Sequence, residues 1–331
     1  MFLENAFHGK NDVGRWIAMI VILIICTQFI GLIPLGIKIF LNINDNPDLI
    51  PDPENSLDLT AYDISPVTGL ALLIIPFVLG VIALLLLMKP IHERPMLSVL
   101  TGGSSFRWKR FFWGFGIWLI LMAIYSLVTT LTGLQKIEFQ YDPKTIISLV
   151  VVSVLFLPFQ TGFEETFYRG YLMQGFTRIF RNKWVPLLLS AFLFGGLHYY
   201  NPEVRAFGLA VMMPQYVWFG IFFGICTLMD DGLELAWGVH TVNNIFMSVL
   251  FTQESSTIQT PALFNITWYY PLTDLISLVI LSMIFIYIAN RRFAWPEWRY
   301  IIVKVESPLK DEENEEFGGY LGYDEYEDDD D

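Results

Sequence analysis

The stretch IISLVVVSVLFLPFQTGFEETFYRGYLMQGFTR, residues 146–178, decides the fold class of this chain. Its first eighteen residues are uncharged, and Glu164, Glu165 and Arg169 then follow within the same apolar surroundings. A helix needs ~20 apolar residues to cross the hydrocarbon core of a bilayer. Charged groups inside such a span cost ~2.5–3.5 kcal/mol each on insertion scales, so they are functional candidates by default.

The rest of the sequence repeats this apolar pattern. Of its 331 residues, 54% are hydrophobic and only 16% are charged, whereas a soluble domain usually carries about a quarter charged residues. Because a bilayer forces backbone hydrogen bonds to close within each segment, the apolar segments are expected to be helices. The sequence therefore predicts an all-α polytopic membrane protein of about eight transmembrane helices. The predicted spans are 16–40, 67–88, 111–134, 146–178, 184–199, 206–229, 232–251 and 272–289.

The charges outside the spans are unevenly distributed. Fifteen Lys and Arg residues flank one set of span ends, and four flank the opposite set: Lys38, Lys136, Lys144 and Arg205. By the positive-inside rule, the richer set is cytoplasmic, and an even number of spans then places both termini in the cytoplasm. Segment 306–331 holds 13 acidic residues and one lysine, so it carries 12 of the 13 net negative charges. Such a tail is expected to be a disordered appendage.

These features predict four regions along the chain. Residues 1–144 form an N-terminal transmembrane region with three spans, and residues 145–251 form the catalytic core. Residues 252–305 hold the last span and a basic flank, and residues 306–331 form the acidic tail.

Polar and ionisable groups lie inside three of the predicted helices. They are Glu164, Glu165 and Arg169 in the first, His198 in the second, and His240 and Asn244 in the third. Measured by helix rise from the nearest charged flank, Glu164 lies roughly 21 Å deep, His198 roughly 22 Å, and His240 and Asn244 roughly 14 to 20 Å. The sequence therefore predicts that the three helices bring these groups to one level of the membrane.

The helix that carries the glutamates is too long for a simple span. A straight helix from Lys144 to Arg178 would measure about 51 Å, against a hydrocarbon core of ~30 Å. Pro158 lacks a backbone N–H, so we expect a kinked or divided helix with its break at Pro158, just before the glutamates.

The residue spacing indicates a division of roles. Glu165 and Arg169 are four residues apart with the acid first, the better orientation for a helical ion pair. A carboxylate beside a neutral imidazole can take a proton from water, and we assign Glu164 and His198 to that task. His240 and Asn244 project from one helix face and are suited to stabilise an oxyanion. The predicted reaction is peptide-bond hydrolysis within the membrane, without a covalent intermediate.

Other readings of the same residues stay open. Glu164, His198 and His240 could also ligate zinc, as in a metalloprotease, although no H-E-x-x-H helix is present. A non-catalytic membrane regulator or immunity protein could keep the cluster as a packing core. Proton-coupled transport also uses buried Glu and His, but no inverted repeat of broken helices favours it.

Three motifs in this order resemble a known family. They are E-E-x-x-x-R at residues 164–169, F-x-x-x-H at residues 194–198 and H-x-x-x-N at residues 240–244. The sequence is similar here to the CAAX-processing and bacteriocin-processing (Abi) membrane proteases, which include the type II CAAX prenyl endopeptidases. The resemblance covers roughly residues 145–251. It implies an eight-helix fold, a glutamate-dependent protease with a cytoplasm-facing cavity, and the roles given above for Glu164, His198, His240 and Asn244.

These observations set the expected partners. No cofactor is expected, with zinc as the open alternative. The expected partners are a membrane-associated peptide or protein substrate and the lipid bilayer, with no nucleic acid. The expected location is an integral position in the plasma membrane.

Overall fold

The computed structural model describes residues 1–49, 59–253, 255–257 and 259–306. Nearly all of the predicted acidic tail lies outside this part of the chain. The α-helices are α1 (Val13–Ile24), α2 (Ile33–Asp45), α3 (Pro66–His92), α4 (Trp108–Leu131), α5 (Pro143–Glu165), α6 (Met173–Phe180), α7 (Trp184–Leu197), α8 (Pro202–Phe207), α9 (Leu209–Met229), α10 (Glu234–Leu250) and α11 (Pro271–Phe293). The strands are β1 (Gln135–Phe139), β2 (Phe251–Thr252) and β3 (Phe264–Tyr269).

The helical class is confirmed, and each of the eight predicted segments is helical over most of its length. Segment 16–40 comprises α1, a π-helical segment (Ile25–Ile30) and α2, and segment 146–178 comprises α5, a second π-helical segment (Thr166–Leu172) and α6. Within the described residues, six helical runs are long and apolar enough to cross a membrane: Val13–Asp45, Pro66–His92, Trp108–Leu131, Pro143–Phe180, Leu209–Met229 and Pro271–Phe293. The other two helices are shorter, with 14 residues in α7 and 17 in α10. The number of spans and the side on which the termini lie therefore stay predictions.

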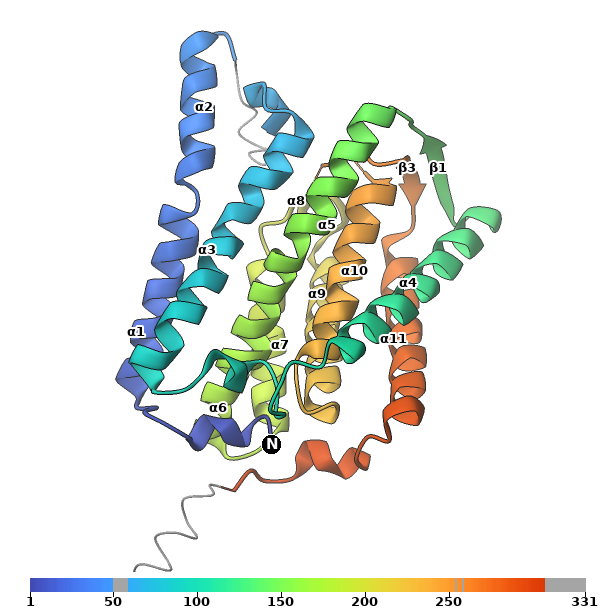
Figure 1. The fold of residues 1–331 in the computed structure, drawn as a ribbon. Coiled ribbons are helices and arrows are strands. Elements are labelled where there is room, and N and C mark those ends of the chain that lie inside the picture. Colours follow the sequence, from blue (N-terminus) through green and yellow to red (C-terminus); the bar gives the residue numbers. More distant parts are fainter. Residues whose placement is uncertain (50–58, 254, 258, 307–331) are drawn as a thin grey trace, which may run out of the picture.

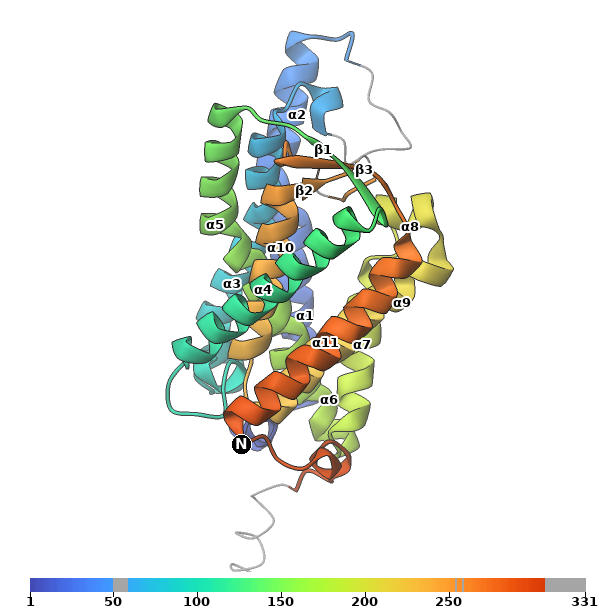
Figure 2. The same ribbon diagram turned by 90° about the vertical axis from the view of Figure 1, so that its right-hand side faces the viewer.

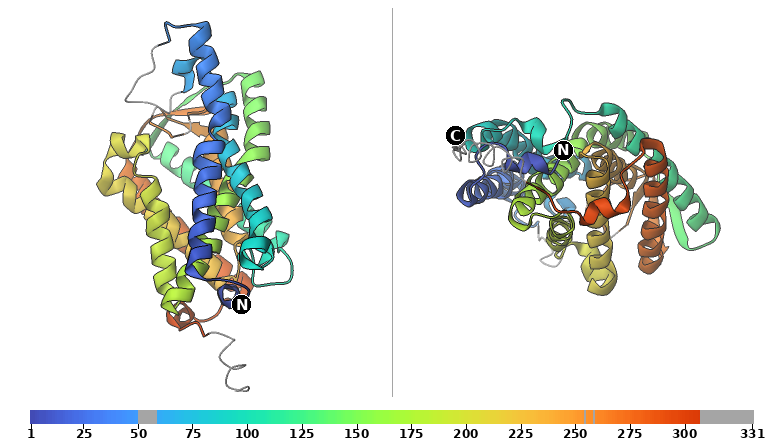
Figure 3. Two further views of the ribbon diagram at one scale, coloured as in Figure 1. Left: turned by 90° about the vertical axis from the view of Figure 1, so that its left-hand side faces the viewer. Right: turned by 90° about the horizontal axis from the view of Figure 1, so that it is seen from below.

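The helices form one bundle. The N-terminus and the C-terminal end of the described chain lie at the same end of this bundle (Figure 1). The α1–α2 unit lies on one flank and α11 on the opposite flank, as the view from below shows (Figure 3). At the far end of the bundle, β1, β3 and β2 form a small sheet that the sequence did not predict (Figure 2). In it, β3 pairs antiparallel with β1 and parallel with β2.

Helix α10 packs between its neighbours at very short range. A Cβ placed on Gly238 would lie 2.1 Å from the Phe111 carbonyl oxygen of α4, and one on Gly162 of α5 would lie 2.4 Å from the Trp237 ring. Small residues at helix contacts let membrane helices approach closely. The two glycines therefore fix α10 against α4 and α5, which positions the polar side chains that α10 carries.

Candidate active site

The glutamate pair ends α5, and a π-helical segment follows it directly. This segment, Thr166–Leu172, contains Arg169 and continues into α6. The helix was predicted to be kinked or divided at Pro158; the division is wrong, because α5 passes through this residue without interruption, and the kink stays a prediction. The Pro158 carbonyl accepts a hydrogen bond from Trp237 Nε1 at 3.1 Å, which joins α5 to α10 at this residue. The irregular segment instead follows the glutamates, and π-bulges are frequent at functional sites.

Glu165 is the centre of the polar cluster. Its Oε1 accepts from Arg169 Nη1 at 3.0 Å and from His240 Nδ1 at 2.8 Å. Both Glu165 and Arg169 are 0% exposed. The predicted Glu165–Arg169 contact is therefore present, and the same carboxylate also ties α5 to α10.

His240 contacts both glutamates. Its Nδ1 faces Glu165, and its Nε2 lies 3.5 Å from Glu164 Oε2. The imidazole stacks on Phe223 of α9, with 4.8 Å between ring centroids. Glu164 also accepts, through Oε1, a long hydrogen bond of 3.5 Å from Gln160 Nε2.

His198 caps the C-terminal end of α7. Its Nδ1 is 2.8 Å from the Phe194 carbonyl oxygen, and its ring stacks on Tyr216 at 4.3 Å. The Phe194 ring lies near both His198 and His240, with centroids 4.8 and 6.0 Å away. Within the described residues, no hydrogen bond or ion pair joins His198 to Glu164.

Asn244 lies one turn beyond His240 on α10. Its Oδ1 accepts from Asn243 Nδ2 at 3.3 Å. The described part of the chain supplies no hydrogen-bond partner for Asn244 Nδ2. The Nδ2 amino group therefore remains able to donate to a ligand on the face that Asn244 shares with His240.

Arg169 is held mainly by aromatic rings. Its guanidinium carbon lies 4.2 Å from the Phe194 centroid and 5.2 Å from the Phe223 centroid. Among the described residues, Arg169 Nε and Nη2 and Glu165 Oε2 are buried without a hydrogen-bond partner. Unpaired buried polar atoms are uncommon in native proteins and are concentrated at functional sites or beside ordered water. The cluster thus has more hydrogen-bonding capacity than its own contacts use.

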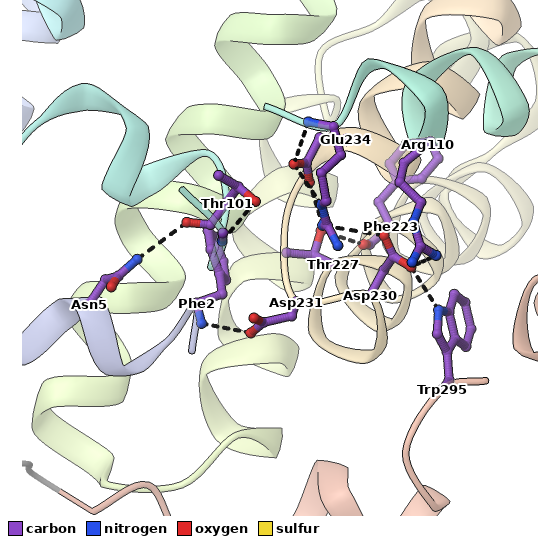
Figure 4. Close-up of polar contacts among 12 residues, drawn as sticks. Phe2, Asn5, Thr101, Arg110, Phe223, Thr227, Asp230, Asp231, Glu234 and Trp295 are labelled. Carbon is purple, nitrogen blue, oxygen red and sulfur yellow. Dashed lines mark hydrogen bonds and ion pairs between the residues drawn. The ribbon is translucent and has the colours of Figure 1, made fainter. Parts of the chain in front are cut away.

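A second ionic network fixes the turn between α9 and α10 (Figure 4). Arg107 binds Glu234 through Nε at 2.9 Å and Nη2 at 2.6 Å, and Asp230 accepts from Arg110 at 2.8 Å and from Trp295 at 2.9 Å. Burial raises the pKa of Asp230 to about 6, although the hydrogen bond from Trp295 and both guanidinium groups lower it. This network anchors the first turn of α10, the helix that carries His240.

The described residues contain no group of three or more His, Cys, Asp or Glu side chains placed to hold a metal ion. His240 Nδ1 is already engaged by Glu165. That contact does not exclude a metal, because metal-ligating histidines commonly donate their other ring N–H to a carboxylate. A catalytic zinc site needs three protein ligands, and the described residues do not place Glu164, His198 and His240 as such a group.

Sequence reasoning missed several side chains of the cluster. Gln160 lies four residues before Glu164, so its helical spacing could have revealed it. Phe223 and Tyr216, which stack on the two histidines, had no such signal, because the chain holds 28 Phe and 15 Tyr. Their role depends on how α9 packs, which their own sequence neighbours do not reveal.

Comparison with known proteins supports the resemblance drawn from the motifs. Residues 142–246 match the family described as type II CAAX prenyl endopeptidase Rce1-like. This segment contains all six predicted site residues, and the family is one of proteases. The molecule is therefore a polytopic helical membrane protein in which residues 142–246 are similar to the type II CAAX prenyl endopeptidase family.

A curated relative extends the similarity beyond this domain. The chain is 28% identical over 244 residues to "Uncharacterized protein YyaK" of Bacillus subtilis (strain 168). The aligned segment covers 73% of this chain and 81% of that protein. No solved structure matches the chain.

Proposed function

We propose that this protein is an intramembrane glutamate-dependent endopeptidase that hydrolyses a peptide bond near the membrane. Glu164 and His198 activate the water, and His240 and Asn244 stabilise the oxyanion. The observation that carries the proposal is the contact of His240 with both glutamates, at 2.8 Å to Glu165 and 3.5 Å to Glu164. In the proposed mechanism, this contact lies between the base and one of the oxyanion donors.

The tautomer of His198 leaves one ring nitrogen able to accept a hydrogen bond from water. A backbone carbonyl can only accept a hydrogen bond, so His198 Nδ1, 2.8 Å from the Phe194 carbonyl, must carry a proton. In the neutral imidazole, Nε2 is then an acceptor. That nitrogen can hold one hydrogen of the water while Glu164 takes the other.

The protonation of His240 follows from similar reasoning. A carboxylate accepts hydrogen bonds, so His240 Nδ1, 2.8 Å from Glu165, carries a proton. If His240 donates to an oxyanion, it must do so through a second proton on Nε2. The donor form is therefore the imidazolium, and Glu165 provides its counter-charge within the buried cluster.

The reaction then proceeds in two steps. The water oxygen bonds to the scissile carbonyl carbon, and its proton moves to the Glu164 carboxylate. The carbonyl oxygen becomes the oxyanion, which accepts from His240 Nε2 and Asn244 Nδ2. The C–N bond then breaks as Glu164 returns the proton to the leaving amine.

Substrate and location follow from the position of the cluster. Glu164, Glu165 and Arg169 lie within Pro143–Phe180, a helical run that is long and apolar enough to cross a membrane. A membrane-associated peptide or protein is therefore the proposed substrate, and the plasma membrane is the proposed location. The cluster itself contains nothing that selects for a prenyl group.

The test compares membranes that contain the wild type, Glu164→Gln or Glu297→Gln. The last is a matched control, because the Glu297 side chain is 75% exposed at the end of the bundle. Mass spectrometry of new protein termini should find a set that wild type and control share and Glu164→Gln lacks. If a folded Glu164→Gln variant generates the same termini as the wild type, the enzyme proposal fails.

A further inference from the structure

Two hydrogen bonds connect α4 to the proposed oxyanion site. Trp118 Nε1 of α4 donates to Asn243 Oδ1 at 3.3 Å, and Asn243 Nδ2 donates to Asn244 Oδ1 at 3.3 Å. Asn243 was not among the residues that the sequence singled out. It is nevertheless the side chain that contacts the Asn244 amide.

The direction of this chain is fixed by its first member. An indole N–H can donate but cannot accept, so only the oxygen end of the Asn243 amide can face Trp118. The amide nitrogen of Asn243 must then point the other way, toward an acceptor. That acceptor is Asn244 Oδ1, so Asn244 Nδ2 is turned away and kept as a donor.

The first member is rigidly held. Trp118 is 2% exposed, and its ring packs against Phe222 and Phe285 with centroids 5.1 and 5.9 Å away. A rigid anchor loses little conformational entropy when it orients a neighbour. The indole can therefore transmit a fixed orientation along the two amides.

We propose that Asn243 is a positioning residue, which holds the Asn244 amide so that Nδ2 faces the oxyanion and Oδ1 does not. This inference rests on the proposed function, because it assigns Asn244 the role of oxyanion donor. An amide rotated by a half-turn would present its oxygen to the oxyanion and repel it. Asn243 and Trp118 exclude that rotamer.

The surroundings of Asn243 make the proposal testable. Asn243 lines a cavity of about 160 Å³ between α4, α9, α10 and α11, which Gln215 of α9 also lines. A substitution at Asn243 therefore meets space and does not have to displace a packed neighbour. Gln215 provides a second amide in the same cavity whose described contacts do not include Asn244.

The variant Asn243→Asp tests the donor step. The new carboxylate still accepts from Trp118 but cannot donate to Asn244 Oδ1, so the Asn244 amide should rotate and present its oxygen to the site. Loss of one oxyanion donor typically lowers kcat by ~10²–10³. For a misdirected donor we expect kcat to fall by about 10- to 100-fold, with KM within about twofold of wild type.

The matched control is Gln215→Glu, which adds the same charge to the same cavity and should leave kcat within about twofold. The probe is a fluorescence-quenched peptide that spans a cleavage site lost in Glu164→Gln, assayed in proteoliposomes. In an Asn244→Ala background, Asn243→Asp should cause no further loss of kcat, because the residue that it positions is gone. Thermal unfolding of each variant separates a folding defect from a positioning defect.

Three results would overturn the inference: unchanged kcat in Asn243→Asp, an equal loss in Gln215→Glu, or a full additional loss in the Asn244→Ala background. These outcomes differ from failure of the proposed function. If Glu164→Gln itself leaves protein termini unchanged, the protease proposal fails first and this inference fails with it. If Glu164→Gln is inactive and Asn243→Asp is normal, only the positioning role is wrong.

Discussion

Replacing Glu165 by Gln tests whether the buried cluster contributes separately to the stability of the fold and to catalysis. The side chain keeps its shape and loses its charge. In the wild type, Oε1 accepts from both Arg169 and His240, and Glu165 and Arg169 are 0% exposed. The substitution therefore leaves a buried guanidinium and an imidazole without their carboxylate.

The two expected effects have different sizes. Removing one partner of a buried ion pair typically costs ~3–5 kcal/mol, because the remaining charge is uncompensated. The free energy of unfolding should fall by that amount. Separately, His240 Nδ1 loses its carboxylate partner, so the imidazole is no longer held in the orientation from which Nε2 donates to the oxyanion. Loss of one such donor lowers kcat by ~10²–10³.

A second variant separates the effects. Combining Glu165→Gln with Arg169→Met removes the uncompensated cation, and the unpaired buried charge is the main cause of the loss when one partner of a buried pair is removed. The free energy of unfolding should therefore recover largely, whereas kcat should stay low. Intrinsic tryptophan fluorescence follows unfolding, and the quenched peptide in proteoliposomes reports kcat. Glu297→Gln provides the surface control.

Two results would refute the reasoning. If Glu165→Gln is folded and its kcat lies within about threefold of wild type, Glu165 does not hold His240 as a donor. If the double variant regains kcat together with stability, the loss in the single variant came from misfolding, and the catalytic step assigned to the imidazolium is wrong.

Three further predictions concern packing, pH and metal. Gly238→Ala would bring its Cβ to 2.1 Å from the Phe111 carbonyl oxygen, so the thermal midpoint should drop, with a cost of ~1–3 kcal/mol from overpacking. Gly36→Ala is the control, because a Cβ at Gly36 would have no atom within 4 Å. Equal thermal midpoints for the two variants would contradict the close α4–α10 contact. Because burial raises the pKa of Asp230 to about 6 from its usual 3.8, the folded protein keeps this proton to a higher pH than the unfolded chain, and the carboxyl destabilises the fold increasingly as pH rises through that interval. The thermal midpoint of Asp230→Asn minus that of wild type should therefore grow between pH ~4 and ~7, and a constant difference would contradict the raised pKa. Cleavage should survive a strong zinc chelator, and purified protein should contain no stoichiometric zinc; activity lost on chelation and restored by zinc would favour the metalloprotease alternative.

The helical architecture was largely predictable from hydropathy. The bilayer requires each segment to satisfy its own backbone, so apolar runs such as 67–88 identify helices such as α3 directly. The strands β1 and β3 were missed, because both lie between predicted spans and pair with each other across more than 120 residues of sequence. Hydropathy carries no information about such long-range pairing.

The members of the buried polar cluster were predictable from the sequence, but their contacts were only partly so, and their catalytic roles stay a proposal. The cost of burying charge indicated Glu164, Glu165, Arg169 and His240 before any coordinates. Helical spacing also indicated the Glu165–Arg169 contact. The contacts of His240 with the glutamates depend on the approach of α10 to α5, which Gly162 permits, and spacing within one helix does not encode that approach.

The position of the π-helical segment also could not be predicted from the neighbouring residues in the sequence. Pro158 was the obvious place for a break, yet the helix continues through it. The hydrogen bond from Trp237 to the Pro158 carbonyl comes from α10, a helix distant in sequence. The π segment starts at Thr166, directly after the glutamates, and no proline or glycine marks that residue.

The most direct test of the proposed mechanism is the kcat of purified Glu164→Gln in proteoliposomes, measured with the quenched peptide. Loss of a general base typically lowers the rate by ~10²–10⁴, so kcat should fall by about that factor while the thermal midpoint stays at or above that of wild type. A folded Glu164→Gln variant that cleaves the peptide at the wild-type rate would contradict the assignment of Glu164 as the base.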